Sequence, residues 1–265
     1  MSASSSTPAV QGVQEADTST TAIFQVGEDG DVILVVGLNK DKIQVHSSFL
    51  KHVSLVFRVM MTSAMSEGEA LRNKVDDSPV EIMLPEDSAR AIRQILQYLY
   101  GANPCPAPDS VVMKEIAILA NKYDMVSRLR YFAFFWLQHI PVDTTTMPGM
   151  ESAWNLLVAS YLLEVHAPFF NISKKLVASK GSLLKHVKST HDEVLGLQLG
   201  SEFAVNLPWN TYLHTDKASV AIEEVRSAAK SRKLDMGLCL GCLIHATDSF
   251  TKRHAQCKHL AWHFP

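Results

Sequence analysis

The chain has 265 residues, of which 25 are Lys or Arg and 27 are Asp or Glu, so its formal net charge is -2. Without a summed positive field, it is not expected to bind nucleic acid through bulk electrostatics. Hydrophobic residues make up 47% of the chain, which excludes a generally disordered or fibrous protein and indicates a globular one.

The first 21 residues are rich in Ser, Thr and Ala, and we predict a disordered tail over residues 1–21. They have neither the positive start nor the apolar stretch of a secretory signal. No uncharged apolar run in the chain reaches the roughly 18 residues that span a bilayer. We therefore expect a soluble intracellular protein, in the nucleus or the cytoplasm, with no membrane partner. In a reducing compartment its four cysteines are expected to be thiols or metal ligands.

The segment after the tail predicts a β-hairpin followed by helices. Residues 31–38 are an apolar, β-branched run, and residues 42–45 make a second short strand after a polar turn. From Ser47, apolar residues recur every three or four positions, which predicts two short helices divided near Ser54. A polar loop is predicted for residues 66–78.

A strand and a helix are predicted next. Residues 79–84 alternate apolar and polar side chains, as a strand with one buried face does. Asp87 or Ser88 then caps a helix with an apolar stripe, and Gly101 ends it because glycine adopts positive φ readily.

Two further helices are predicted beyond a proline-rich connector, residues 103–108. Asp109 caps the first, which extends to Tyr123. The second covers about residues 125–139 and is so aromatic that we expect burial on more than one side, with Phe135 or Trp136 pointing inward.

The best domain boundary is residues 141–150, where two prolines, a glycine and three threonines predict a linker. Residues 151–265 are predicted to be all helical. The first of these helices starts near Trp154 and is stopped by Pro168, and shorter helices are expected around Gly181. A polar helix is predicted over residues 216–233.

The order of strands and helices over residues 28–139 resembles the BTB/POZ domain, in the form common among fungal proteins. The stretches GDVILVVG, IQVHSSFL, ARAIRQILQYLYG and ILANKYDMVSRL carry the resemblance. Within them, five residues follow the order and spacing of the family: Asp31, His46, Ser54, Phe57 and Tyr123. The resemblance implies an α+β fold, with a small mixed sheet covered by helices, over residues 22–140. The all-helical region then follows it.

Structural roles are expected for these five residues. His46 follows a strand and precedes a helix, where a hydrogen-bonded structural histidine is more common than a ligand or a catalyst. Asp31 is expected to accept backbone N–H bonds in the preceding turn. Tyr123 is expected to pack its ring and leave its hydroxyl at the surface. The five residues indicate a fold and imply no reaction.

The resemblance further implies a protein-interaction module. BTB domains commonly form homodimers or recruit other proteins, and a subset are substrate adaptors of ubiquitin ligases built on the third cullin. Met65-Ser66-Glu67 fits the apolar-x-Glu motif that cullin-binding members carry. A methionine offers adaptable apolar area, and Glu67 can orient a basic partner. The alternative is a solvated loop with one buried methionine.

Self-association is a separate possibility. Family members that dimerise by exchanging an N-terminal strand need an apolar extended segment before the core, and only residues 22–26, AIFQV, supply one here.

Cysteine and histidine gather at the C-terminus, where residues 239–265 hold three of the four Cys and four of the eleven His. Cys239 and Cys242 form a C-x-x-C pair that suits a zinc knuckle, with the remaining ligands supplied by Cys257 and His259. His254 is an alternative fourth ligand. The cysteines can equally be part of a small apolar core, since free cysteine is often buried. Fungal proteins of this family carry similar Cys-rich ends.

No enzyme is predicted. Cys257 and His259 lie too close in sequence to act as nucleophile and base, and no phosphate-binding glycine loop occurs. The chain is therefore interpreted as a non-enzymatic interaction protein, either a scaffold or adaptor that can self-associate, or a substrate-recruiting adaptor of a cullin-based ligase. A lesser alternative is a zinc-braced nucleic-acid-binding or transcription-associated protein, for which the C-terminal tail has few cations.

Overall fold

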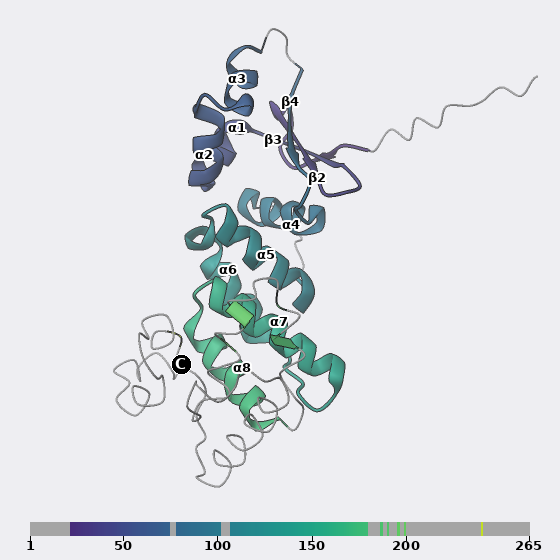
Figure 1. Cartoon of the computed structure of the whole chain (residues 1–265), viewed down its shortest axis with the longest axis vertical. Coiled ribbons are helices and arrows are strands. Elements are labelled where there is room, and N and C mark those ends of the chain that lie inside the picture. The colour runs from purple at the N-terminus through teal and green to yellow at the C-terminus, as the bar shows by residue number, and fades with distance from the viewer. Residues whose placement is uncertain are drawn as a thin grey trace, which may run out of the picture.

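The structure, a computed structural model, describes residues 22–74, 78–101 and 107–179, and the single positions 186, 187, 190, 195, 196, 199 and 240. Figure 1 shows the strands and helices that these residues form. In chain order they are β1 (Phe24–Gln25), β2 (Val32–Val36), β3 (Asp41–Val45), α1 (Ser47–Val53), α2 (Leu55–Thr62), α3 (Ser66–Arg72), β4 (Val80–Leu84), α4 (Ala89–Tyr100), α5 (Ser110–Lys122), α6 (Val126–His139), α7 (Met147–Leu162) and α8 (His166–Ala178).

The strands form one small mixed sheet, which confirms the predicted fold class. β2 and β3 make the predicted antiparallel hairpin, with Leu34 opposite Ile43. β4 pairs parallel with β2, and β1 pairs parallel with β3, so the order is β1-β3-β2-β4. The hairpin reverses after Gly37, whose φ of 71° lies in the left-handed region that glycine enters without a steric cost.

One face of the sheet is covered by helices. Val32, Leu34 and Val36 of β2 are fully buried on that face, together with Ile43 and Val45 of β3. Figure 1 shows α1, α2 and α3 beside the sheet. Each fully buried side chain of this size contributes roughly 1.5–3 kcal/mol, so the inward positions of the hairpin are a main source of stability.

The ends of α4 and α5 follow the sequence closely. Ser88 caps α4 with its side chain, and Gly101 ends it with a φ of 74°. Asp109 caps α5, because its Oδ1 accepts the N–H groups of Val111 and Val112, both at 3.0 Å. Both caps satisfy backbone donors that a helix start leaves unpaired.

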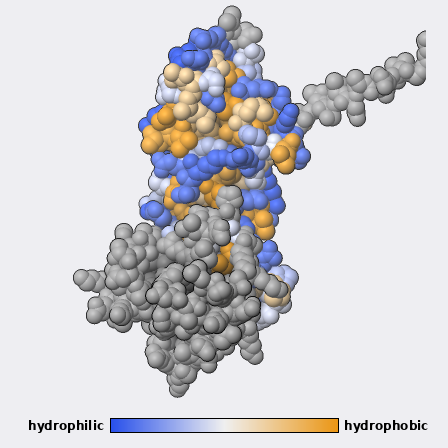
Figure 2. Space-filling view, viewed as in Figure 1, coloured by the Kyte–Doolittle hydropathy of each residue, from blue (hydrophilic) through white to orange (hydrophobic). Residues whose placement is uncertain are grey.

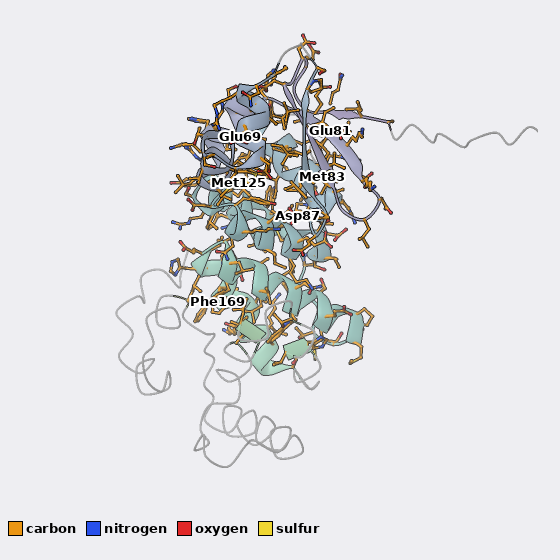
Figure 3. All side chains as sticks on the ribbon, turned by 45° about the horizontal axis from the view of Figure 1, so that its top comes forward. Glu69, Glu81, Met83, Asp87, Met125 and Phe169 are labelled. Atoms are coloured by element: carbon orange, nitrogen blue, oxygen red, sulfur yellow. The ribbon has the colours of Figure 1, made fainter. Side chains whose placement is uncertain are left out.

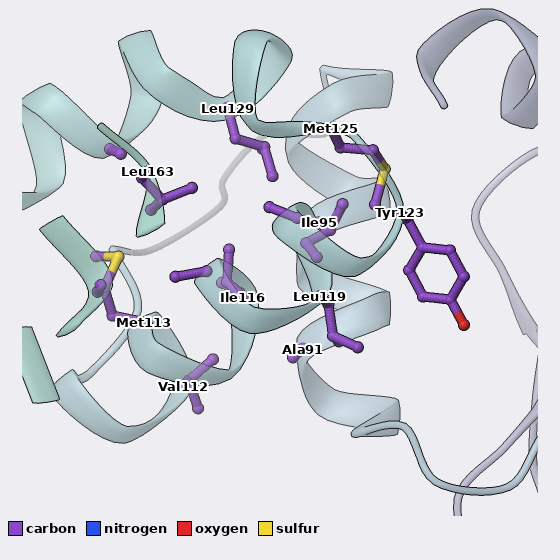
Figure 4. Close-up of a cluster of buried hydrophobic side chains, with 14 of the residues drawn as sticks. Ala91, Ile95, Val112, Met113, Ile116, Leu119, Tyr123, Met125, Leu129 and Leu163 are labelled. Carbon is purple, nitrogen blue, oxygen red and sulfur yellow. The ribbon is translucent and has the colours of Figure 1, made fainter. Parts of the chain in front are cut away.

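The helices from α4 onward share one hydrophobic core with each other. Figure 4 shows Ile95 of α4, Ile116 of α5, Leu129 of α6 and Leu163, which follows α7, pointing into one space. α5 contacts both α4 and α7, and α8 contacts α7. The predicted linker, residues 141–150, therefore joins helices that pack together.

The predicted loop over residues 66–78 is wrong in its first half, where α3 forms. Glu67 and Glu69 lie in the first turn of α3, where negative charge is favourable because the helix dipole is positive at that end. The α3 segment is polar and has no apolar residues at helical spacing, so its sequence did not predict this short helix.

Two prolines lie inside first turns rather than between helices. α7 begins at Met147, within the predicted linker, with Thr146 as its cap and Pro148 in its first turn. Pro168 lies in the first turn of α8, whereas the preceding helix already ends at Leu162. The N–H groups of the first helical turn have no acceptor within the helix, so a proline there loses no helical hydrogen bond. Both positions are therefore compatible with a helix.

Several predicted features lie outside the described residues. They are the tail over residues 1–21, the helices around Gly181, the polar helix over residues 216–233 and the cysteine and histidine cluster over residues 239–259. Among the helices of the described part, none is long and apolar enough to cross a membrane.

Candidate protein-interaction surface

The predicted apolar-x-Glu motif lies at the start of α3. Met65 immediately precedes the helix and is 53% exposed. Glu67 is partly exposed in the first turn, and the hydroxyl of Ser66 donates to its carboxylate at 3.1 Å. The alternative of a loop with a buried methionine is wrong, because Met65 is exposed and the residues after it are helical.

α3 is fixed against the end of α2. Nη1 of Arg72 donates to the carbonyl oxygens of Thr62 at 3.3 Å and of Ser63 at 2.9 Å. A Cβ atom on Gly68 would lie 2.4 Å from the carbonyl oxygen of Ser63, so this close approach requires glycine. The backbone that carries Met65 therefore has a defined position relative to α2.

α2, which precedes this motif in the chain, adds two exposed apolar side chains. Leu55 is 52% exposed and Val59 is 49% exposed, and a spacing of four places them on the same side of the helix. Phe57 and Met61 point the other way, into the core. We call Leu55, Val59 and Met65 together the α2–α3 apolar surface. Figure 2 shows hydrophobic residues at the surface in the region of α2.

Leu55 and Val59 are not among the residues that the sequence predicted to lie at a binding site. The signal that reveals them is the density of apolar residues in LVFRVMM, which exceeds what one buried face of a helix can use. A helix that is apolar on two sides and packs on one leaves the other exposed.

α6 is also exposed on one side, so the prediction that it is buried on more than one side is wrong. Four of its aromatic residues are exposed, namely Tyr131 (77%), Phe132 (37%), Phe134 (37%) and Phe135 (61%). Of the two candidates for an inward residue, Trp136 is buried and Phe135 is not. The physical reason is that the core contacts of α6 come from one side, through Leu129 and Ala133.

α2 and α6 start at the same junction. The hydroxyl of Ser54 caps α2 by accepting the N–H of Phe57 at 3.0 Å, and it donates to the carbonyl oxygen of Tyr123 at 2.6 Å. Nη2 of Arg128, in the first turn of α6, donates to the carbonyl oxygen of His52 at 3.4 Å. In Figure 1, α2 and α6 lie along the same edge of the molecule.

Asp31 joins the start of β2 to the start of α1. Its carboxylate accepts the backbone N–H of Ser47 at 2.6 Å and the hydroxyl of Ser47 at 2.7 Å. The predicted acceptance from the preceding turn is therefore wrong, because the donor lies at the N-terminus of a helix. Partial burial raises the pKa of Asp31, but the hydrogen bonds from Ser47 outweigh it and hold the pKa below its usual value.

His46 and Tyr100 form a second contact between distant segments. Nδ1 of His46 lies 3.1 Å from the Tyr100 hydroxyl, which also accepts the backbone N–H of His46 at 3.2 Å. Partial burial raises the pKa of Tyr100. This geometry supports a structural role for His46, because its ring ties α1 to the end of α4.

Tyr123 is the clearest departure from prediction at a single residue, because its hydroxyl is buried. The ring stacks on Phe57 with centroids 4.5 Å apart, and the hydroxyl donates to the Asp87 carboxylate. Lys122 Nζ lies 2.7 Å from the same carboxylate. Figure 3 shows Asp87 where β4 has ended and α4 is about to begin, and Figure 4 shows Tyr123 at the edge of the helical core.

Nothing in the described ranges brings three or more His, Cys, Asp or Glu side chains together as a metal site. The predicted zinc ligands Cys239, Cys242, Cys257 and His259 lie outside these ranges, so zinc binding stays a prediction.

Comparison with known families identifies the N-terminal part of the chain. The family model of the BTB/POZ domain matches residues 22–137, from the segment of β1 to the last turn of α6. Comparison with curated proteins gives no match. The family match confirms the resemblance inferred from the sequence. Because the BTB/POZ domain is a protein-interaction module, it supports a non-enzymatic interaction role for this chain.

Proposed function

We propose that this chain, whose residues 22–137 form a BTB/POZ domain, is a non-enzymatic adaptor that binds another protein through the α2–α3 apolar surface. The observation that carries the proposal is that Leu55, Val59 and Met65 are each about half exposed on a backbone with a fixed position. Exposed apolar side chains that lie together on a folded protein often mark an interaction site, and the spacing of Leu55 and Val59 places both on one side of α2.

The chemistry of the surface favours a partner with an apolar helix and a basic residue. Met65 is flexible and polarisable, so it adapts to the groove that it meets. Glu67 follows Met65 by two residues, in the first turn of α3, and a carboxylate beside apolar contacts selects and orients a positively charged partner. An adaptor needs such a binding surface but does not need catalytic residues.

A second candidate function is substrate recruitment to a cullin-based ubiquitin ligase. The specific observation in its favour is that Met65 and Glu67 have the apolar-x-Glu spacing and are both accessible directly after α2. In this arrangement the cullin binds at α3, and the helical region after residue 141 binds the substrate. Such an adaptor acts inside the cell, in the nucleus or the cytoplasm, and imaging of a tagged chain tests that location.

A charge reversal tests both candidates. Glu67→Lys is compared with Glu69→Lys, which makes the same charge change two residues further along α3 on an exposed side chain (Figure 3). The assay measures binding to the purified third cullin. If Glu67→Lys abolishes binding and Glu69→Lys keeps it, and both variants melt as the parent does, the result supports the ligase adaptor.

The general adaptor proposal has its own test. If the parent chain binds no cullin, the ligase hypothesis fails and only the proposal of a general adaptor remains. Replacing Leu55 and Val59 with Ser, which leaves the core untouched, is then expected to abolish capture of whichever protein co-purifies with the parent chain. Unchanged capture would contradict the α2–α3 apolar surface as the binding site.

Self-association is part of the proposal, in a form that keeps β1 on its own sheet. The Arg93 guanidinium lies 4.4 Å from the centre of the Phe24 ring, and a Cβ on Gly27 would lie 2.5 Å from Nδ1 of His46. Exchange of β1 between two chains breaks these contacts within each chain and has to form them again with the partner copy, whereas association without exchange leaves them in place. Sedimentation velocity of Phe24→Ala tests this: a dimer that persists supports association without strand exchange, and a dimer lost in the folded variant contradicts it.

A further inference from the structure

We propose that the outward side of α6 is a second docking site, which binds an acidic amphipathic helix of a partner protein. Tyr131, Phe134 and Phe135 form this side, and we call them the α6 aromatic strip. Their spacing of three and four residues places them on one side of the helix. Tyr131 is 77% exposed and Phe135 is 61% exposed. The ring of Phe134 meets that of Phe135 edge to face, with centroids 5.8 Å apart.

The size of the strip fits a helix better than a second globular protein. With about 200 Å² for a whole aromatic side chain, the three residues expose roughly 350 Å². That is as large as the main apolar patch of a typical monomer. A stable complex between globular proteins buries about 800 Å² on each partner. An amphipathic helix needs only anchors at a spacing of three and four residues, which is the spacing of the strip.

The charges beside the strip favour an acidic occupant. α6 carries Arg128 and Arg130 and has no Asp or Glu. Glu164 pairs with Arg130. Arg128 donates to a backbone carbonyl, and no carboxylate of the described residues forms an ion pair with it. Two copies of this chain would bring like charges together at the strip, whereas an acidic helix neutralises them.

The strip is held ready for binding by the buried side of the same helix. Leu129 is fully buried and Leu137 is 5% exposed. The Trp136 ring lies 4.4 Å from that of Tyr98 on α4. Because these contacts fix α6, a partner helix meets a surface that is already ordered, which lowers the entropic cost of association.

The experiment measures the fluorescence anisotropy of two labelled peptides with the purified full chain. Each peptide has about 18 residues, or five helical turns, with leucines every three or four positions. One carries Glu beside the leucine stripe, and the other carries Lys at the same positions. We expect the Glu peptide to bind and the Lys peptide to bind much more weakly.

Variants locate the binding site. Tyr131→Ala is expected to weaken binding of the Glu peptide by about tenfold or more, as loss of a central aromatic anchor does. Arg128→Glu is expected to weaken binding of the Glu peptide and strengthen binding of the Lys peptide. Leu38→Ala is the control, since Leu38 is 95% exposed in the turn after β2 and is expected to change nothing. Both α6 variants are expected to melt as the control does.

Several results would overturn the proposal. They are the absence of Glu-peptide binding at millimolar concentration, equal binding of both peptides, and binding that Tyr131→Ala leaves unchanged. A shift in sedimentation of the free chain on Tyr131→Ala would make a second copy the occupant instead. Glu67→Lys separates this site from the α2–α3 apolar surface, because it is expected to leave peptide binding intact. Loss of peptide binding in that variant would place the site on α3.

Discussion

Replacing Tyr123 with Phe removes one oxygen atom from the junction between β4, α2 and α5. The Tyr123 side chain is almost fully buried, and its hydroxyl donates to Asp87, whose side chain is only 2% exposed. Phenylalanine keeps the ring stacked on Phe57, at a centroid distance of 4.5 Å in the parent. The variant therefore isolates the hydrogen bond, and it leaves Lys122 as the remaining partner of a buried carboxylate.

The expected cost follows from the burial of the acceptor. A hydrogen bond to a charged group contributes about 1.5–3 kcal/mol, and a buried acceptor that loses its donor keeps its desolvation penalty. We expect Tyr123→Phe to lower the free energy of unfolding by about 2–3 kcal/mol. For a chain of this size that corresponds to a fall in melting temperature of about 4–12 °C.

Urea unfolding followed by tryptophan fluorescence measures this cost, with Tyr131→Phe as the matched control. Tyr131 is 77% exposed on α6, so the same chemical change there is expected to cost almost nothing. Burial raises the pKa of Tyr123, with further contributions from Asp87, so its stabilisation is complete below about pH 10 and is lost as the pH rises further. Two results would refute the reasoning. One is an equal loss of unfolding free energy in the two Phe variants, and the other is an equal dependence of that free energy on pH above about 10 in Tyr123→Phe and its parent.

Three further predictions concern single contacts. Asp31→Asn is expected to lower the melting temperature at pH 7. Hydrogen bonds from Ser47 lower the pKa of Asp31, so its contribution to stability is lost as the pH falls below about 4. The difference in melting temperature between the variant and the parent is therefore expected to close at low pH. Ser54→Ala is expected to cost about 2–3 kcal/mol in denaturant unfolding, since it removes the cap on the Phe57 N–H and a buried donor; a cost near zero would contradict this role. Cys239→Ser is expected to remove zinc that copurifies with the parent, as measured by elemental analysis, and a parent free of zinc would end the hypothesis of a zinc knuckle.

Local rules account for most of the elements that the sequence predicts correctly. The hairpin of β2 and β3 follows from two β-branched runs around a polar turn, and α4 follows from a capped start at Ser88 and a glycine at position 101. α3 was missed because a short polar helix has no apolar period to reveal it. Its stability comes from contacts to α2, such as those of Arg72, and not from its own composition.

The interaction surfaces were only partly predictable. Met65 and Glu67 are recognisable from a three-residue motif, but whether Met65 is buried depends on where α3 lies. In the same way, the aromatic residues of α6 indicate a buried helix when composition alone is considered. Their exposure arises because, within the described part of the chain, one side of α6 packs against other helices and the opposite side does not.

The sequence by itself indicated the BTB/POZ resemblance of residues 28–139, the order of the strands and of the longer helices within them, and the near-neutral charge that suits a module for binding proteins. Tertiary structure alone decided which apolar side chains are surface and which are core, and which distant groups meet, as Tyr123 meets Asp87 and Asp31 meets Ser47. The physical reason is that periodicity is a property of one segment, whereas burial and hydrogen-bond partners depend on the segments that pack against it.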